Sequence, residues 1–326
     1  MTISPAESFT LPLTLRNWPW QRRMNPHYKV AQAQSGAWLE SFRPFRPEKM
    51  AAFNKCDFAL VSALTFPDAS LYNLRSCCDL MNTFFALDEY TDVLPPEQVR
   101  QLCDLTADAI QNPERSRRKG EHIIGEITRQ FWIRARAKMP AVVEERFIRA
   151  WKTYLDSVVE QAVRRASSYV CTLDEYMIAR RDNIGSDPSF AFLEVSLGLN
   201  LPHFVMEHPT IVALNRDTTD MIILANVSVN LISASTRRTK RINQDMCSYR
   251  KEVLANDADY NAVTVVMHNY GTNLSGAMEW ISDLHDEIVE HFLLLSHQVI
   301  HHEGFPSFGP EIDDQLARYI DGLGEF

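Results

Sequence analysis

The chain has 326 residues, of which 45% are hydrophobic, and it carries only 11 Gly and 16 Pro. This composition supports a sizeable core and disfavours a strand-rich protein with many tight turns. The net charge of −9 and the lack of a basic stripe interleaved with aromatic residues argue against a nucleic-acid binder, so we expect no nucleic-acid partner.

The six cysteines include no C-x-x-C pair, so we interpret them as reduced thiols rather than zinc ligands or a disulfide framework. The first residues lack a basic stretch followed by an apolar one, as a secretory signal would have. No apolar run approaches the roughly 18 residues that a membrane-spanning helix needs. We therefore expect a cytoplasmic protein with no membrane span.

Residues 1–26 are irregular and contain several prolines, and we expect them to wrap over the surface of the body. No alternating strand pattern, internal repeat or low-complexity linker follows. The sequence therefore predicts an all-α fold, with a single domain over residues 1–326. Apolar residues recur with helical periodicity over 27–41, 48–65, 70–92, 96–111, 117–137, 141–167 and 260–298.

Two carboxylates stand one helical turn apart in the segment FFALDEYTD, residues 84–92. On a helix Asp88 and Asp92 project from the same face, and burying both behind Phe84 and Phe85 would be costly without a cation. Mg²⁺ takes oxygen ligands and often shares them with substrate phosphates, so the pattern indicates a magnesium site. The alternative that these residues alone leave open is a solvated acidic helix end.

Over nearly its whole length, the chain resembles the fungal sesquiterpene synthases, which are class I terpene synthases. The likeness is carried by the aspartate-rich motif at Asp88, by LRSCCDLMN before it, and by NPHY and AFNKCDFAL further upstream. It implies a helical bundle around a central active-site cavity, and the ionisation and cyclisation of farnesyl diphosphate. Asp88, and secondarily Asp92, would hold Mg²⁺ ions that bridge to the diphosphate; the family number is three per active site.

The family's second metal motif is N-D-x-x-S-x-x-x-E, whose Asn, Ser and Glu form a stripe along one helix face. In DMCSYRKE, residues 245–252, Ser248 and Glu252 match the last two of these ligands. The first ligand position holds Gln244 instead of Asn. Asn243 is one residue out of phase and would point about 100° away on a helix.

Removing residues 227–244 would join Asn226 to Asp245 and restore the whole motif on one uninterrupted helix. The segment can be encoded with GT at its start and AG at its end, the boundary signals of a spliceosomal intron. Its 18 residues correspond to the length of a short fungal intron. We interpret it as a retained intron, with Asn226 as the metal ligand. The alternative is a genuine surface insertion, with Gln244 or Asn243 as ligand.

A further family element is an R-x-x-x-G segment whose Arg senses the diphosphate and whose Gly marks a helix break. Arg181 and Gly185 match it by spacing. A planar guanidinium suits phosphate because it donates two parallel hydrogen bonds. Arg181 precedes Asn226 by 45 residues, which fits the family, whereas the 63 residues to Gln244 are too many.

Further diphosphate contacts follow from the resemblance. Lys251 lies inside the second metal motif. Family members end with an Arg-Tyr pair that hydrogen-bonds the diphosphate, and Arg318-Tyr319 is the only such pair in this sequence. The family usually carries the functional pair in a later, Trp-containing segment. A structural role for Arg318-Tyr319 is therefore the alternative.

The sequence thus predicts a terpene cyclase, a lyase that forms a sesquiterpene from an isoprenoid diphosphate, with Asp88 and Arg181 as catalytic residues and a monomer or homodimer as the working form. A chain-elongating prenyltransferase would need a second aspartate-rich motif, which Ser248 and Glu252 replace here. The alternative is a catalytically impaired or inactive helical protein of this family, because the second metal motif is interrupted and the C-terminal tail of the family is missing.

Overall fold

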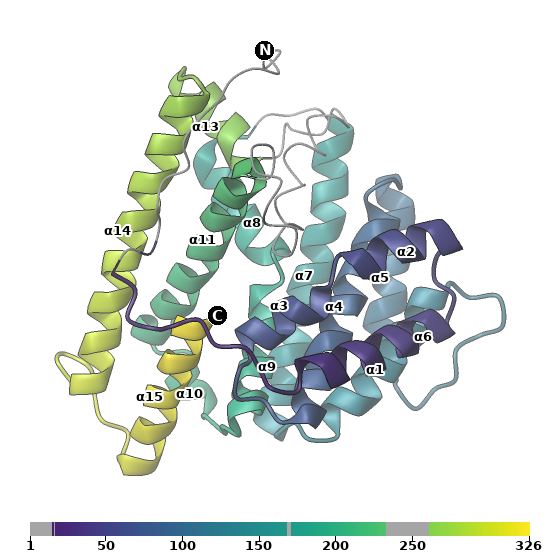
Figure 1. The fold of residues 1–326 in the computed structure, drawn as a ribbon, viewed down its shortest axis with the longest axis horizontal. Helices are drawn as coiled ribbons and strands as arrows, with labels where there is room; N and C mark the ends of the chain where they lie inside the picture. The colour runs from purple at the N-terminus through teal and green to yellow at the C-terminus, as the bar shows by residue number, and fades with distance from the viewer. Residues whose placement is uncertain (1–14, 16, 168–170, 233–260) are drawn as a thin grey trace.

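The computed structural model describes residues 15, 17–167, 171–232 and 261–326, with residues 226–232 as backbone only (Figure 1). Every regular element in these ranges is a helix, which confirms the predicted all-α fold. None of the described helices is long and apolar enough to cross a membrane. In chain order the helices are α1 (Tyr28–Ser41), α2 (Pro47–Lys55), α3 (Phe58–Thr65), α4 (Leu71–Thr91), α5 (Pro96–Gln111), α6 (Ile123–Arg136), α7 (Ala141–Ser167), α8 (Leu173–Asn183), α9 (Ser186–Leu197), α10 (His203–Met206), α11 (Pro209–Ile232), α13 (Ala262–Tyr270), α14 (Leu274–His301) and α15 (Pro310–Glu325).

Local sequence sets several helix starts. Ser70 accepts a hydrogen bond from the backbone N–H of Asn73 at the start of α4. At the start of α8, Thr172 and Glu175 form a capping box in which each side chain accepts from the other residue's backbone N–H. Prolines occupy the first turn of α2, α5 and α15, where the missing N–H has no helical partner to lose.

Two predicted helical segments are wrong in extent, because each is divided by a turn. The segment 48–65 breaks at Asp57, which adopts a left-handed conformation with φ 53° and accepts a hydrogen bond from Gln32. The segment 260–298 breaks after Gly271, with φ 63°, and Asn273 then caps α14 by accepting from the backbone N–H of Gly276. Asp and Gly tolerate a left-handed conformation better than most residues do, and Asn is a favoured helix cap.

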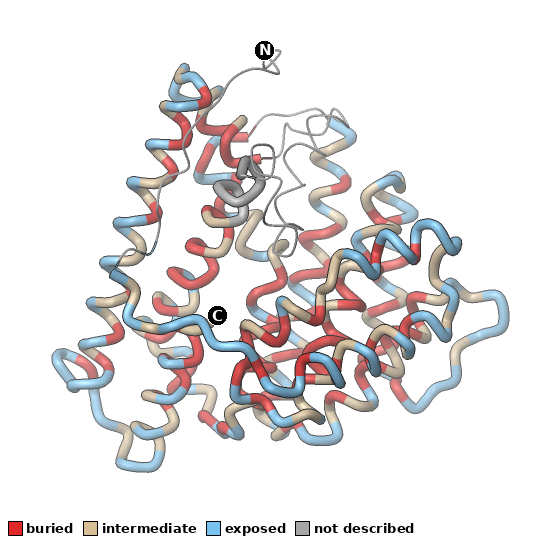
Figure 2. Tube along the Cα trace, viewed as in Figure 1, coloured by how far each residue is buried: buried red, intermediate tan, exposed pale blue. Residues whose placement is uncertain are grey.

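The helices gather in two groups joined by α7, α8 and α9 (Figure 1). Helices α1–α6 form one group, and α11, α13, α14 and α15 form the other. Buried residues line the helix faces that turn inward, and exposed residues line the outer faces (Figure 2). The larger core contains a run of packed aromatic rings between α4, α6, α7 and α9, made by Phe84, Phe131, Trp132, Phe147, Trp151, Tyr154 and Phe192.

Residues 17–26 lie outside any helix and cross from α14 and α15 to the start of α4 (Figure 1). The ring of Trp18 packs on Phe292 of α14 at a centroid distance of 5.3 Å, and its Nε1–H donates to the carbonyl of Gly324 at 2.8 Å. Arg23 donates to the carboxylates of both Asp68 and Glu325. This segment therefore ties the start of the chain to its last helix.

Candidate active site

The predicted aspartate pair stands at the C-terminal end of α4. Asp88 is exposed in the last turn of the helix, and Asp92, directly after the helix, is half-buried. The backbone N–H of Asp92 donates to the carbonyl of Asp88 at 3.0 Å, so the two residues stay one turn apart. Glu89 is paired with Lys49 of α2 at 2.7 Å. Asp88 and Asp92 therefore stay close together, while the Glu89 carboxylate between them pairs with Lys49.

One turn before Asp88, the ring of Phe84 packs against the break between α8 and α9. The break expected at Gly185 is present, because α8 ends at Asn183, α9 begins at Ser186, and Gly185 is left-handed with φ 80°. A Cβ atom on Gly185 would lie 3.4 Å from Cζ of Phe84. This contact brings the acidic end of α4 to the segment that carries Arg181.

Arg181 lies near the end of α8 and forms a two-point ion pair with Asp220 of α11. Its Nε donates to Oδ1 at 2.7 Å and its Nη2 to Oδ2 at 2.8 Å. The Asp220 side chain is 7% exposed and that of Arg181 is 32% exposed. The hydrogen bonds that Arg181 donates to Asp220 raise the pKa of Arg181 above its already high ordinary value, so the guanidinium stays charged.

Tyr154 of α7 lies between the acidic end of α4 and the end of α8. Its ring packs on Phe84 at a centroid distance of 4.7 Å. Burial raises the pKa of Tyr154 well above its usual range, the negative charges of Asp88 and Asp92 raise it further, and the positive charge of Arg180 lowers it. The phenol is therefore neutral at every working pH, and it lies close enough to feel charges from both the acidic end of α4 and the end of α8.

The second metal motif is only partly described. Asn226 lies within α11, six residues after Asp220, and the helix continues past it to Ile232. Residues 233–244 of the suspected insertion lie outside the described part of the chain. The same holds for the predicted ligands and contacts Asn243, Gln244, Ser248, Lys251 and Glu252.

We tested whether the described residues fit a magnesium ion. Among them, no group of three or more His, Cys, Asp and Glu side chains could hold a metal ion. Mg²⁺ usually keeps several waters and binds through one or two carboxylates plus substrate phosphates, so it does not need such a cage. The carboxylates of Asp88 and Asp92, which stand one helical turn apart, therefore fit a magnesium ion that is shared with a diphosphate.

Arg318 lies at the other end of α9 from Gly185, whereas the Tyr319 hydroxyl bonds to α11 one turn before Thr219. Arg318 is exposed and donates to the carbonyl of Leu197, the last residue of α9. Tyr319 is fully buried, and its hydroxyl donates to Oδ1 of Asn215 at 2.9 Å. The 12 residues of α9 span roughly 18 Å. The structure therefore does not bring Arg318 together with Arg181, and the Tyr319 hydroxyl is already engaged by Asn215.

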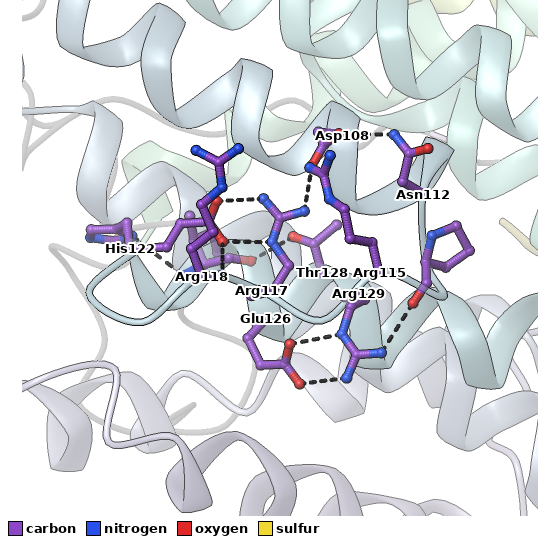
Figure 3. Close-up of polar contacts among 12 residues, drawn as sticks. Asp108, Asn112, Arg115, Arg117, Arg118, His122, Glu126, Thr128 and Arg129 are labelled. Atoms are coloured by element: carbon purple, nitrogen blue, oxygen red, sulfur yellow. Dashed lines mark hydrogen bonds and ion pairs between the residues drawn. The ribbon is translucent and has the colours of Figure 1, made fainter.

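A second charged cluster lies in the connection between α5 and α6 (Figure 3). A cavity of about 430 Å³ opens there, lined in part by Arg117, Glu121 and Arg129. Arg117 donates to Asp108 and Glu121, and Arg129 donates to Glu126. Arg117 and Arg129 already have carboxylate partners, so these two arginines hold the connection in place.

Comparison with known proteins gives the family. The model described as terpene synthase family 2, C-terminal metal binding, matches residues 79–291. The chain belongs to the terpene synthase family. A Delta(6)-protoilludene synthase of Stereum hirsutum is 40% identical over 317 residues, which cover 97% of this chain and 79% of that relative. Sesquiterpene synthase 14 of Postia placenta is 40% identical over 313 residues, which cover 96% of this chain and 82% of that protein.

Solved structures agree on the fold of this terpene synthase. An α-eudesmol synthase superposes with a TM-score of 0.78 at 18% identity, covering 95% of this chain and 94% of that one. Germacradien-4-ol synthase from Streptomyces citricolor gives a TM-score of 0.77 at 20% identity, covering 97% of this chain and 96% of that one. The predicted family, enzyme class and helical fold are thus confirmed, and the chain is a terpene cyclase of the sesquiterpene synthase type.

Sequence reasoning missed two residues of this terpene synthase's site. Asp220 lies 39 residues after its partner Arg181, and Tyr154 lies on a different helix from the acidic motif. Neither belongs to a short motif. The only sequence signal for Asp220 is a carboxylate directly before the apolar run of residues 221–225, which needs a partner when it is buried.

Proposed function

We propose that this terpene synthase uses Mg²⁺ to ionise farnesyl diphosphate and cyclises the resulting allylic cation to a sesquiterpene. The observation that carries the proposal is the packing of Phe84 on Gly185. It sets the carboxylates of Asp88 and Asp92 beside the segment of Arg181. The names of the relatives, which are protoilludene and sesquiterpene synthases, support the substrate and the product class.

Asp88 and Asp92 would hold Mg²⁺ at the end of α4, together with Asn226, Ser248 and Glu252 from the second motif. We propose three ions per active site, the number that the family resemblance implies. When bound, the metal would neutralise the negative charge that develops on the diphosphate leaving group. Asp88 suits this role because its carboxylate is exposed at the end of its helix.

Arg181 would donate to the diphosphate oxygens, and Lys251 would add a second positive charge beside them. The guanidinium binds and orients the leaving group because its donors lie in one plane. Arg318 and Tyr319 bond to Leu197 and to Asn215, which supports a structural role for the pair over a diphosphate contact.

The aromatic residues behind the acidic motif suit a carbocation reaction. Phe84, Trp151 and Tyr154 pack on one another with centroid distances from 4.7 to 5.7 Å. Ring faces attract cations, and a wall of buried rings excludes the water that would quench an intermediate early. We propose that this group forms the apolar floor beneath the diphosphate end of the site.

We further propose that residues 227–244 are a retained intron. Their removal would join Asn226 to Asp245 and give N-D-x-x-S-x-x-x-E, with its ligands spaced along one face of the extended α11. Genomic DNA with GT at the Val227 codon and AG at the Gln244 codon, together with a spliced transcript that lacks the segment, would support this proposal. A gene that lacks GT at the Val227 codon, or AG at the Gln244 codon, contradicts the proposal.

The test of the proposed function is a paired assay. The full chain and a version without residues 227–244 are each incubated with farnesyl diphosphate and Mg²⁺, and the headspace is analysed by gas chromatography and mass spectrometry. We expect sesquiterpene from the shortened version and much less from the full chain. No terpene from either version contradicts the proposed function.

The second candidate function is an impaired or inactive protein, and the interruption between Asn226 and Ser248 favours it for the full chain. The same assay decides between the two. If the full chain is as active as the shortened version, the impaired alternative and the retained-intron proposal are both wrong. Gln244 or Asn243 would then be the metal ligand.

A further inference from the structure

Two consecutive residues of α11 bond to opposite sides of the break between α8 and α9. Asp220 accepts both hydrogen bonds of Arg181, which lies before the break. The hydroxyl of Thr219 lies 2.8 Å from that of Ser186, which lies directly after it. The helix that carries Asn226 is therefore joined to both helices that meet at Gly185.

The geometry of the ion pair determines which edge of the guanidinium Asp220 leaves unoccupied. An arginine carries five N–H donors, and Asp220 accepts from Nε and from one of the two hydrogens on Nη2. Among the described residues, no acceptor lies on Nη1 of Arg181. The outer edge, formed by Nη1 and the second Nη2 hydrogen, faces away from Asp220 and matches two oxygens of a phosphate group.

We propose that Asp220 is a positioning residue for the reaction, which holds the guanidinium of Arg181 so that its outer edge meets the diphosphate. This inference rests on the proposed function of Arg181. A long arginine side chain loses rotamer freedom when it binds a ligand. Asp220 removes most of that freedom before the diphosphate arrives, and the rigid α11 backbone fixes Asp220 in turn. The diphosphate then binds a group that is already in place.

The alternative is that Asp220 only neutralises a half-buried arginine, and Asp217 provides a matched control. Asp217 lies one turn earlier on α11, is buried to a similar degree, and has its own partner in His291 of α14 at 2.7 Å. Burial raises the pKa of Asp217, which His291 partly offsets. Both residues are thus buried carboxylates of the same helix, but only Asp220 bonds to Arg181.

The experiment measures the binding of inorganic diphosphate with saturating Mg²⁺ to the full chain by calorimetry. The variants are D220N, D217N, R181A and R181A/D220N. We expect D220N to weaken binding about 10-fold, because the amide cannot accept at both positions and presents a donor to Nη2. D217N is expected to lower the melting temperature to a similar extent and to change diphosphate binding less than twofold. D220E, which keeps the charge on a longer side chain, should recover part of the loss.

The double variant separates positioning from other effects. If Asp220 acts through Arg181, adding D220N to R181A changes binding less than twofold. The inference is overturned if D220N lowers the affinity for diphosphate equally in the wild-type and the R181A background. It is also overturned if D220N binds diphosphate as tightly as wild type does. Should D220N not fold, D220E carries the comparison, with at least a threefold loss expected and wild-type binding contradicting the inference. If the unmutated full chain does not bind diphosphate, the same comparison is made with the version that lacks residues 227–244. Absence of binding in both versions contradicts the proposed function, whereas binding that D220N leaves unchanged contradicts only the inference about Asp220.

Discussion

Phe84 and Gly185, which are 101 residues apart in the sequence, lie so close that a Cβ added to the glycine would be 3.4 Å from Cζ of the ring, at van der Waals contact. The glycine has φ 80°, a conformation that only residues without a Cβ adopt at little cost. The contact therefore joins the acidic end of α4 to a backbone break that tolerates few other residues.

We predict that Gly185→Ala lowers both stability and activity. The left-handed backbone costs about 1 to 2 kcal/mol for a residue with a Cβ, and relieving it would move the break away from Phe84. We expect at least a 10-fold loss of kcat/KM for farnesyl diphosphate, measured on the more active version of the chain.

Gly198 is the matched control for Gly185. It caps the other end of α9 with φ 65°, and a Cβ there would meet nothing within 4 Å. Gly198→Ala should cost a similar free energy of unfolding and leave kcat/KM within about twofold, because it leaves the break at Gly185 in place. Equal loss of activity in both variants would show that α9 matters only as a whole.

We predict that Asp88→Asn lowers kcat by at least about 100-fold, since the loss of a metal ligand removes several kcal/mol of transition-state stabilisation. The free energy of unfolding should change little because Asp88 is exposed. Glu89→Gln is the control, since Glu89 pairs with Lys49. If Asp88→Asn and Glu89→Gln have equal kcat values, the assignment of Asp88 is wrong.

The local parts of this site could be predicted from the sequence and the rest could not, for a physical reason. Asp88 and Asp92 are related by one helical turn, and Arg181 and Gly185 by another, so spacing alone relates the members of each pair. The partner of Arg181 depends on how α8 packs against α11. Asp57 and Gly271 show the same limit in the fold, because periodicity continues across a single left-handed residue that divides two helices.

We predict that Asp79→Ala costs about 3 to 5 kcal/mol of unfolding free energy. Asp79 is fully buried in α4 and accepts hydrogen bonds from Arg75, Arg134 and Ser35, so its removal leaves two arginines without their carboxylate. Urea unfolding followed by circular dichroism measures the change.

Asp156 is the control for Asp79, since it also pairs with two basic side chains, Arg100 and Lys152, but at the surface. Exposed ion pairs contribute about 1 kcal/mol or less, so Asp156→Ala should be nearly neutral. If both variants lose the same free energy, burial does not determine the strength of the Asp79 network.

We predict that the cluster in Figure 3 stabilises the fold above pH 5 and loses this effect in acid. Hydrogen bonds from Arg117 and from Arg129 hold the pKa values of Glu121 and Glu126 below the ordinary range. The folded chain therefore binds fewer protons than the unfolded chain near pH 4. The stabilisation is complete above the unfolded pKa of about 4.3 and disappears as the pH falls through the folded values.

Melting temperatures between pH 7 and pH 3 test this prediction. Glu126→Gln should be less stable than wild type at pH 7, by about 1 kcal/mol or less, and should approach it at pH 3. Glu114→Gln, at a side chain that is 80% exposed, should follow the wild-type curve throughout. A constant difference between wild type and Glu126→Gln across the whole range would contradict the linkage.

The contact of Trp18 with Gly324 sets an order of events during synthesis. The two residues are separated by 306 positions, so the ribosome completes almost the entire chain after it has made Trp18. At bacterial to eukaryotic elongation rates this interval lasts roughly 15 to 60 s. Helices α1 to α9 therefore emerge and begin to pack while Trp18 and Arg23 still lack α15. The first described part of the chain to be made is among the last to reach its native contacts.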